Sequence, residues 1–283
     1  MISVVTPSFR QLDWLKLCVA SVADQEGPAF EHIVQDAGTG GELEAWARTQ
    51  PGLRFFSEED GGMYDAINRG LRRAQGEICA YLNCDEQYLP GALAQVDLFF
   101  RAHPDIDVLF GDAILLDSDG LPLSYRRIVL PSLLHTKLAH LGTLTCATFF
   151  RRSILERGIY FRPEWKAIGD GVWMQELLGT GTRMATLRRP LAAFTFTGAN
   201  LGGTEEARRE AEAWRRENSS WSDCLRTPAI VMHRMRKFFA RAYRRRSFEL
   251  EIYTLRSPAK RERIAAKGIS CLWPAPGSRR SYP

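Results

Sequence analysis

The sequence predicts an α/β fold built around a parallel sheet. Short apolar runs rich in β-branched residues alternate with segments of helical periodicity over the first hundred residues, and this alternation is typical of βαβ units. Pro, Gly, Asn or Asp follows most of these runs, which indicates where the strands end. Of the 283 residues 45% are hydrophobic and 25% charged, so the chain can bury a large core.

The first hundred residues are predicted to hold four strands separated by helices. The strands are the apolar runs Ile2–Thr6, His32–Gln35, Leu53–Phe56 and Ile78–Leu82. Helices are expected where apolar residues recur every three or four positions, from Leu12 to Val22 and from Met63 to Ala74, and Pro90 is typical of the first turn of another. Residues 1–105 are therefore expected to form a Rossmann-like sheet, which binds ligands at the carboxyl ends of its strands.

Beyond residue 105 the pattern changes to longer β-rich segments. Strands are predicted at Val108–Leu116, Leu123–Leu130, Thr145–Arg151 and Arg183–Thr197, and a helix at Gly169–Leu178. We expect residues 106–222 to form a mixed half that completes the site, followed by a helical extension at 223–272. The tail at 273–283 contains Pro, Gly, Ser and Arg and is expected to be disordered.

The distribution of charge argues against nucleic acid as a partner. Residues 226–263 hold 12 Lys and Arg against 3 Asp and Glu, a local charge of +9 in a chain of net charge +5. The remainder is therefore acidic, whereas a nucleic-acid-binding protein is expected to have a basic face on its folded core.

Cysteine spacing and hydropathy indicate the cellular setting. The six cysteines form no C-x-x-C pair, so we expect reduced thiols and a cytoplasmic protein. No basic segment precedes the first apolar run, and no run approaches the roughly 18 apolar residues that span a bilayer. Any membrane contact is therefore expected to be peripheral, at the inner face of the cell membrane.

Acidic residues directly follow the fourth predicted strand, in the sequence Asn83, Cys84, Asp85 and Glu86. A hard divalent cation takes oxygen ligands, and Mg²⁺ is usually held by one or two carboxylates together with substrate phosphates. Asn and Asp are also common in solvated turns after strands. The segment alone leaves both interpretations open.

The residues around this turn carry the pattern of a known family. The stretch SEEDGGMYDAINRG (57–70) leads through AQG (74–76) to LNCDE (82–86). This order resembles glycosyltransferase family 2, in which D-x-G-x-Y-D-A-x-N-x-G is followed by A-x-G and by a strand ending L-N-S-D-D. The segments VVTPSF (4–9) and IVQDAGT (33–39) are similar to the ends of that family's first two strands. The resemblance covers roughly the first two hundred residues.

This resemblance implies that the first half binds a nucleotide sugar. Asp36 would face the base, and a uracil base is favoured because a carboxylate accepts the imide N–H. Asp65 and Asn68 have an equally good alternative as caps of the helix that follows the loop. The residues with implied nucleotide contacts are Thr6, Pro7, Asp36, Asp60, Asp65, Asn68 and Asn83.

The resemblance also implies a divalent metal, Mn²⁺ or Mg²⁺, that bridges the donor diphosphate and acts as a Lewis acid. Asp85 is the expected ligand, with Glu86 as a second. This sequence departs from the family pattern because Asn83 replaces the first acid and Glu86 replaces an Asp. An amide oxygen carries less charge than a carboxylate, so we expect weak metal affinity.

Asp170 is the candidate catalytic base, in the segment AIGDGVW (167–173). The family has an acid at the start of a helix in this region, and an inverting transferase needs one carboxylate to accept the proton of the acceptor hydroxyl. The alternatives are that Asp170 only caps the helix or that Glu176 is the base.

The segment 226–246 holds eight Arg and Lys and no acid. Apolar residues including Met235, Phe238 and Phe239 are expected on one helical face, with Arg234 and Lys237 on the other. Such a helix either lies in an anionic membrane interface or packs on the domain with its charges in water.

The resemblance therefore implies a metal-dependent inverting glycosyltransferase on a Rossmann-like nucleotide-sugar-binding sheet with a mixed acceptor-side half. It would move a sugar from a nucleotide donor, with a UDP-sugar favoured, to a saccharide or lipid-linked saccharide in surface polysaccharide assembly. One alternative is a sugar-nucleotide-binding protein without turnover. Another is a nucleotidyltransferase, against which the lack of glycine in Thr6–Arg10 argues.

Overall fold

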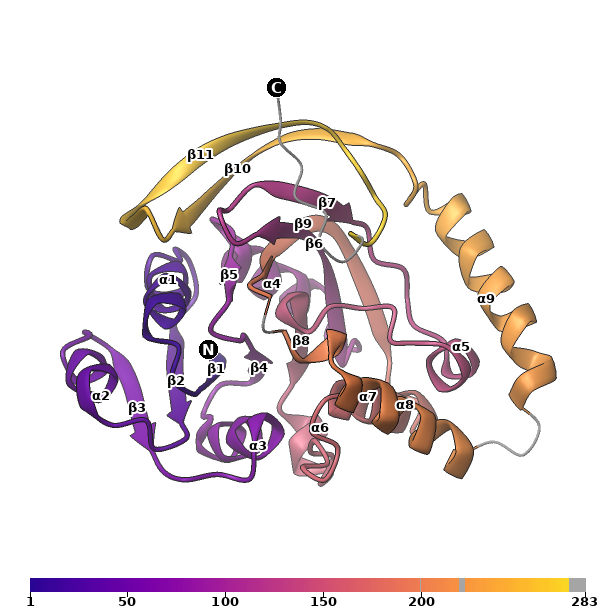
Figure 1. Ribbon diagram of the computed structural model, residues 1–283, viewed down its shortest axis with the longest axis horizontal. Helices are drawn as coiled ribbons and strands as arrows, with labels where there is room; N and C mark the ends of the chain where they lie inside the picture. Colours follow the sequence, from indigo (N-terminus) through magenta and orange to yellow (C-terminus); the bar gives the residue numbers. More distant parts are fainter. Residues whose placement is uncertain (199, 219–221, 275–283) are drawn as a thin grey trace.

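A curved mixed sheet forms the centre of the molecule (Figure 1). The computed structural model describes residues 1–198, 200–218 and 222–274. The strands of this sheet within those residues are β1 (Ile2–Ser8), β2 (Phe30–Asp36), β3 (Leu53–Ser57), β4 (Ile78–Tyr81), β5 (Glu86–Tyr88), β6 (Val108–Asp117), β7 (Pro122–Arg126), β8 (Thr148–Arg151) and β9 (Met184–Phe196). Their order is β3-β2-β1-β4-β8-β6-β9-β5, with β7 paired to β6. The α/β, Rossmann-like fold class that the sequence predicts is confirmed.

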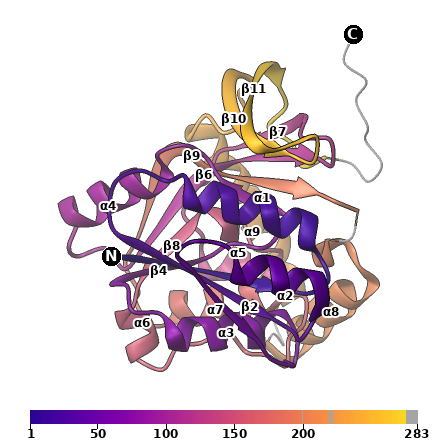
Figure 2. The same cartoon turned by 90° about the vertical axis from the view of Figure 1, so that its left-hand side faces the viewer.

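Helices cover both faces of the sheet. They are α1 (Leu12–Ala23), α2 (Gly41–Arg48), α3 (Met63–Arg73), α4 (Ala92–Ala102), α5 (Leu133–Leu138), α6 (Ser153–Glu156), α7 (Gly169–Gly179), α8 (Glu205–Asn218) and α9 (Ser222–Phe239), with 3₁₀ turns η1 (Thr145–Ala147) and η2 (Leu201–Gly203). Apolar residues of α1 and α4 pack on one face of the sheet, and those of α3, α6 and α7 on the other. Figure 2 shows α1 crossing the first of these faces.

The first four strands run parallel, with β1 at the centre between β2 and β4. Every residue of β1 is buried. A parallel strand that is covered on both faces favours a continuous apolar run rather than an alternating one. The predicted strands of the first half therefore agree with β1 to β4 to within two residues at each end.

One sheet continues through both halves of the chain. Strand β8 is antiparallel to β4 on one side and to β6 on the other, so β6 and its parallel neighbour β9 run in the same direction as β1 to β4. Strand β7 is shorter than the predicted Leu123–Leu130, because the Ile128 N–H donates to the Asp112 side chain (3.0 Å) and not to a neighbouring strand. The predicted strand at Thr145–Arg151 begins instead as the 3₁₀ turn η1.

The C-terminal segment differs from the helical extension predicted at 223–272. Helix α9 ends at Phe239, and the chain continues as an antiparallel hairpin of β10 (Arg246–Thr254) and β11 (Ser257–Ile269) that arches over the sheet (Figure 1). In β10, Leu250 and Ile252 are buried and alternate with exposed Glu249 and Glu251. This period of two is that of a strand.

The hairpin is fixed to the domain by polar contacts. The Gln87 side chain donates to the Tyr253 carbonyl (2.8 Å) and accepts from the Tyr253 N–H (2.9 Å). Both Arg261 and the Tyr253 hydroxyl bond to the Asp24 carboxylate. Beyond the hairpin, the Trp273 ring lies 5.5 Å from that of Phe196. Residue 273, which was expected to be disordered, is therefore packed, and residues 275–283 of the predicted tail lie outside the described residues.

None of the helices in the described ranges is long and apolar enough to cross a membrane.

The approach of α3 to β1 depends on Gly70, since a Cβ there would lie 2.3 Å from Cγ1 of Val5. We predict that Gly70→Ala destabilises the protein by about 1–3 kcal/mol, the usual cost of overpacking, measured by urea denaturation. Gly179→Ala is the control, because its Cβ would meet nothing within 4 Å. Val5→Ala should cost less in the Gly70→Ala background than in the parent; equal costs would contradict the proposed overlap.

Candidate functional site

Polar side chains gather at the carboxyl edge of the sheet. Strands β1, β2, β4 and β9 end at this edge because they all run in the same direction. The end of β9 is tied to the turn after β4, since the Thr195 N–H donates to the Asp85 carbonyl (3.2 Å). Asn200 Nδ2 donates to the Asp85 carboxylate (2.8 Å). Two segments 115 residues apart in the chain therefore meet at Asp85.

The end of β2 forms a closed turn around Asp36. This buried carboxylate accepts from the N–H (2.6 Å) and the hydroxyl (2.9 Å) of Thr39. The neighbouring β1 residues differ in position. Thr6 is buried within the sheet and its hydroxyl bonds to His32 Nε2 (2.8 Å), whereas the Pro7 carbonyl accepts from the Cys84 thiol (3.1 Å). The Thr6 side chain is thus engaged in the core.

The loop before α3 contains a carboxylate that is only partly satisfied. Asp60 Oδ1 accepts from the Gly62 N–H (2.8 Å). Its Oδ2 is buried and has no hydrogen-bond partner among the described residues. Burial raises the pKa of Asp60, and the charges of Asp65 and Asp36 add to this effect. An oxygen of this kind is available to a ligand that carries an N–H or O–H group.

Two other residues predicted to contact the nucleotide have structural partners. Asp65 accepts from the Gly61 N–H (2.9 Å) and pairs with Arg69 (2.9 Å), as expected of a residue that caps the first turn of α3. The amide of Asn68 donates to the Phe161 carbonyl (2.7 Å) and accepts from the Phe161 N–H (3.1 Å). Both hydrogen-bonding groups of Asn68 are therefore used to anchor the loop before α7.

The turn after β4 orients its two acids differently. Glu86 is 1% exposed and accepts from the Asn83 N–H (2.7 Å), so it closes the turn from inside. Asp85 is only partly buried and contacts Asn200 across the edge. Burial raises the pKa of both carboxyls, and the Asp85 charge raises that of Glu86 further. Of the two predicted metal ligands, Asp85 lies at the edge, while the Glu86 carboxylate is turned into the turn.

Oxygen atoms that suit a hard cation remain at this turn. Asn83 Oδ1 is buried without a partner among the described residues, two positions from Asp85. In the described part of the chain, no group of three or more His, Cys, Asp or Glu is placed to hold a metal ion. One carboxylate and one amide oxygen still fit a Mg²⁺ or Mn²⁺ ion that takes its other ligands from substrate phosphates and water.

Asp170 lies at the N-terminal end of α7, near the loop that follows β4. Its carboxylate accepts from the Gly171 N–H (2.7 Å) and from the hydroxyl of Tyr64. Burial raises the pKa of Asp170, and these two hydrogen bonds oppose the rise. The Asp170 charge makes a small contribution to the raised pKa of Glu86, after burial and the Asp85 charge. Glu176, the alternative base, instead pairs with Arg162 (3.6 Å).

Tyr64 is a site residue that the sequence reasoning missed. It is buried, and its ring packs so closely on α7 that a Cβ at Gly169 would lie 2.7 Å from it. The raised pKa of the Tyr64 phenol follows from burial and from the Asp170 carboxylate. Tyr64 lies within the 57–70 motif, and its place in that motif could have indicated that it belongs to the site.

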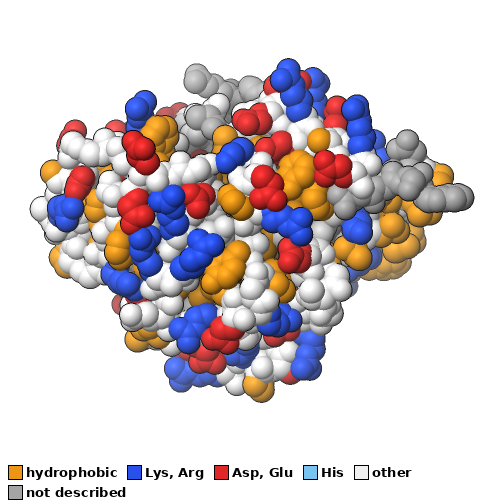
Figure 3. Space-filling model, turned by 90° about the horizontal axis from the view of Figure 1, so that it is seen from below, with side chains coloured by type: hydrophobic (Ala, Val, Ile, Leu, Met, Phe, Trp, Pro, Cys, Tyr) orange, Lys and Arg blue, Asp and Glu red, His pale blue; other side chains and the backbone are white. Residues whose placement is uncertain are grey.

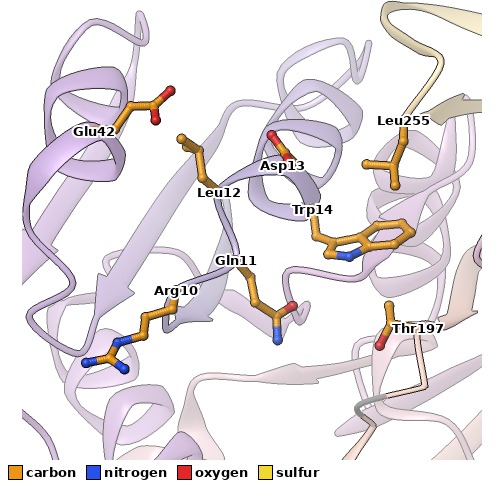
Figure 4. Close-up of a pocket in the computed structure, with 8 residues that line it drawn as sticks. All are labelled: Arg10, Gln11, Leu12, Asp13, Trp14, Glu42, Thr197 and Leu255. Atoms are coloured by element: carbon orange, nitrogen blue, oxygen red, sulfur yellow. The ribbon is translucent and has the colours of Figure 1, made fainter.

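A pocket of about 530 Å³ opens beside the ends of β1 and β9. Figure 4 shows the side chains of Trp14, Thr197 and Leu255 together on one side of it and Arg10 on the other. Phe9, which directly follows β1, is 54% exposed, and the Arg10 guanidinium lies over its ring at 4.8 Å. An exposed aromatic ring at a strand end can stack on a base or sugar. Sequence reasoning had treated Phe9 only as part of the strand motif.

The family of the chain follows from a direct match. The model of glycosyl transferase family 2 matches residues 3–158, more than half of the 283 residues. The chain therefore belongs to glycosyl transferase family 2.

Several curated proteins are similar over shorter segments. Uncharacterized glycosyltransferase Rv1514c of Mycobacterium tuberculosis is 39% identical over 98 residues, which are 33% of this chain and 37% of that protein. TuaG of Bacillus subtilis, named for teichuronic acid biosynthesis, is 31% identical over 128 residues, 44% of this chain and 50% of TuaG. The chain thus spans about half or less of the length of these relatives.

Two solved structures share the fold. Staphylococcus aureus TarS 1–349, in complex with UDP-GlcNAc, has a TM-score of 0.61 at 20% identity. The matched region covers 84% of this chain and 72% of the TarS chain. The mannosyltransferase PcManGT of Pyrobaculum calidifontis, in complex with GDP-Man and Mn²⁺, has a TM-score of 0.51 at 18% identity and covers 83% and 75%. At these identities the likeness extends to the fold alone.

We predict that Tyr64→Phe raises the pKa of Asp170 further. A hydroxyl that donates to a carboxylate favours its charged form, so loss of the donor favours the protonated form. The measurement is a ¹³C NMR titration of the Asp170 carboxyl. Tyr160→Phe is the control, because Tyr160 contacts Arg72. An unchanged Asp170 titration in Tyr64→Phe would show that this hydrogen bond is absent.

Proposed function

We propose that the protein is a metal-dependent inverting glycosyltransferase that moves a sugar from a nucleotide donor to a hydroxyl group. The observation that carries this proposal is the meeting of three groups at one edge of the sheet. They are the partly unsatisfied Asp60 carboxylate, the oxygen atoms of Asn83 and Asp85, and the Asp170 carboxylate. A donor base, a diphosphate and an acceptor hydroxyl each need one of these groups.

The donor base is assigned to the side of the site formed by β1, β2 and the loop before α3. The carboxylates of Asp36 and Asp60 lie near enough for the charge of one to raise the pKa of the other. The free Oδ2 of Asp60 can accept an imide N–H or a ribose hydroxyl, and Phe9 offers a ring for stacking. These groups suit the uracil and ribose of a UDP-sugar, and TarS, one of the proteins that share the fold, was solved with UDP-GlcNAc.

The diphosphate is assigned to the turn after β4. Asp85 and the Oδ1 atom of Asn83 would hold a Mn²⁺ or Mg²⁺ ion there. When bound, the cation would stabilise negative charge on the departing nucleoside diphosphate. The contact of Asn200 with Asp85 fixes the direction of that carboxylate before any ligand arrives.

Asp170 is assigned the role of base. Its raised pKa increases its affinity for a proton, while the Gly171 N–H and the Tyr64 hydroxyl hold its orientation. It would accept the proton of the acceptor hydroxyl as that oxygen attacks the anomeric carbon and the bond from this carbon to the diphosphate breaks. Attack from the face opposite the leaving group inverts the anomeric configuration.

The acceptor is proposed to be a saccharide or a lipid-linked saccharide in surface polysaccharide assembly. TuaG, one of the similar proteins, is named for the synthesis of such a polymer. The pocket beside Trp14 and Thr197 has the size and the aromatic side chain to hold a sugar ring. With a lipid-linked acceptor the protein would work in the cytoplasm, peripherally at the inner face of the cell membrane.

We predict that Asp85→Asn abolishes metal-dependent binding of UDP. Loss of a direct ligand should exceed the roughly 10–100-fold loss of affinity typical of outer-shell partners. Isothermal titration with and without Mn²⁺ measures this effect. Glu86→Gln is the matched control, since an amide oxygen can still accept from the Asn83 N–H. If the Glu86 variant loses metal dependence and the Asp85 variant keeps it, the two assignments are reversed.

We predict that Asp170→Asn keeps donor affinity and lowers the transfer rate by about 10²–10⁴-fold, the usual contribution of a general base. An asparagine keeps the shape of the side chain but cannot accept the proton. Glu176→Gln, the control, should retain activity. Sugar transfer in the Asp170 variant at the parent rate would move the base elsewhere. Absence of sugar transfer and donor hydrolysis in the parent would favour a binding protein without turnover.

A further inference from the structure

Helix α9 exposes large apolar side chains to solvent. Phe239 is 75% exposed, Phe238 68%, Met232 57% and Met235 54%. The two phenylalanine rings contact each other, with centroids 5.8 Å apart. Figure 3 shows hydrophobic side chains gathered at the right-hand end of the molecule, the end where α9 lies in Figure 1. We call the four residues the α9 apolar face. Contiguous exposed apolar surface of this kind is typical of interaction sites.

The opposite side of α9 packs on the domain and is more polar. Ala229 and His233 are buried, and the His233 ring stacks on that of His135 in α5, with centroids 3.8 Å apart. Lys237 is half-buried, and burial lowers its pKa to about 8. Helix α9 therefore buries small and polar side chains against the protein and exposes its large apolar ones, whereas an ordinary surface helix buries its large apolar side chains.

The charge around the α9 apolar face indicates the partner. Residues 226–246 hold eight Arg and Lys and no acid. Arg234, Arg241, Arg244 and Arg245 are exposed. A second copy of the chain would bring two such basic segments together, so their repulsion opposes a dimer through this face. A surface that presents anionic groups above an apolar layer complements both properties, and an anionic lipid bilayer is such a surface.

We propose that α9 is a membrane-docking helix that inserts its apolar face into the interface of an anionic lipid bilayer, with the surrounding arginines on the lipid headgroups. The binding is peripheral and reversible. It rests on α9 alone and is independent of the donor and metal assignments.

This docking would also orient the candidate site. Helix α9 packs against α5, and α5 packs against α7, whose first turn carries Asp170. Figure 1 shows α9 along the outer side of this group of helices. A bilayer against α9 would therefore lie on the side of the molecule where α5 and α7 pack, and α7 carries the candidate base Asp170.

The test is co-sedimentation of the full chain with vesicles of phosphatidylglycerol and phosphatidylcholine in equal parts, compared with phosphatidylcholine alone. We expect binding to the anionic vesicles at least tenfold tighter than to the neutral ones and weaker binding at high salt, because salt screens the electrostatic part. The double variant Phe238→Ser with Phe239→Ser should lose at least tenfold in vesicle affinity. Leu98→Ser is the matched control, since Leu98 in α4 is equally exposed at 68%.

Equal binding of the parent to anionic and neutral vesicles would overturn the proposal, and so would an equal loss of vesicle affinity in Leu98→Ser. A third contrary result is a parent that does not bind vesicles and forms a dimer in analytical ultracentrifugation, with the double variant monomeric. Failure here is separable from failure of the enzymatic proposal. Asp170→Asn should bind vesicles like the parent, and the double variant should bind UDP like the parent.

Discussion

The candidate site depends on one close contact, that of the Tyr64 ring with the backbone at Gly169. A side chain at position 169 would push α3 away from α7, and the Tyr64 hydroxyl would no longer reach Asp170. Asn68, one turn further along α3, bonds both backbone groups of Phe161, whose ring stacks on Tyr64 at 5.6 Å. Helix α3 thereby joins the donor-side loop to the candidate base through packed core, which holds the two sides of the site in register.

Burial then distinguishes acids that look alike in the sequence. Asp65 is satisfied by an N–H group and an arginine, and Glu86 lies inside its turn. Asp60, Asp85 and Asp170 keep capacity for a ligand, a cation or a proton at the edge of the sheet. Neighbouring residues of an extended segment point in opposite directions, so the turn after β4 can carry one acid outward and one inward.

Local periodicity and motif spacing were enough to predict β1 to β4, their parallel arrangement and the edge at which polar residues collect, but not the order of the strands in the sheet or the short strand β5. Side-chain direction was not predictable in this way, because it depends on partners far along the chain. Thr6 turns to His32, 26 residues away, and Asn68 to Phe161, 93 residues away. The hairpin after α9 was not predicted, because the whole segment 223–272 was expected to continue the basic helix. The alternation of Leu250 and Ile252 with glutamates in this segment has the period of a strand.

The orientation of α9 also depends on partners far along the chain, so the sequence does not predict it. Helical periodicity predicts that the segment has two unlike faces, but an isolated helix does not determine which face meets the protein. Helix α5 decides this, because it presents His135 to the ring of His233 and leaves the polar side as the better fit. The apolar side is then directed outward by packing, and the cost of its exposure to water persists until a partner covers it. The arginines around that side limit the partner to one that is both apolar and anionic.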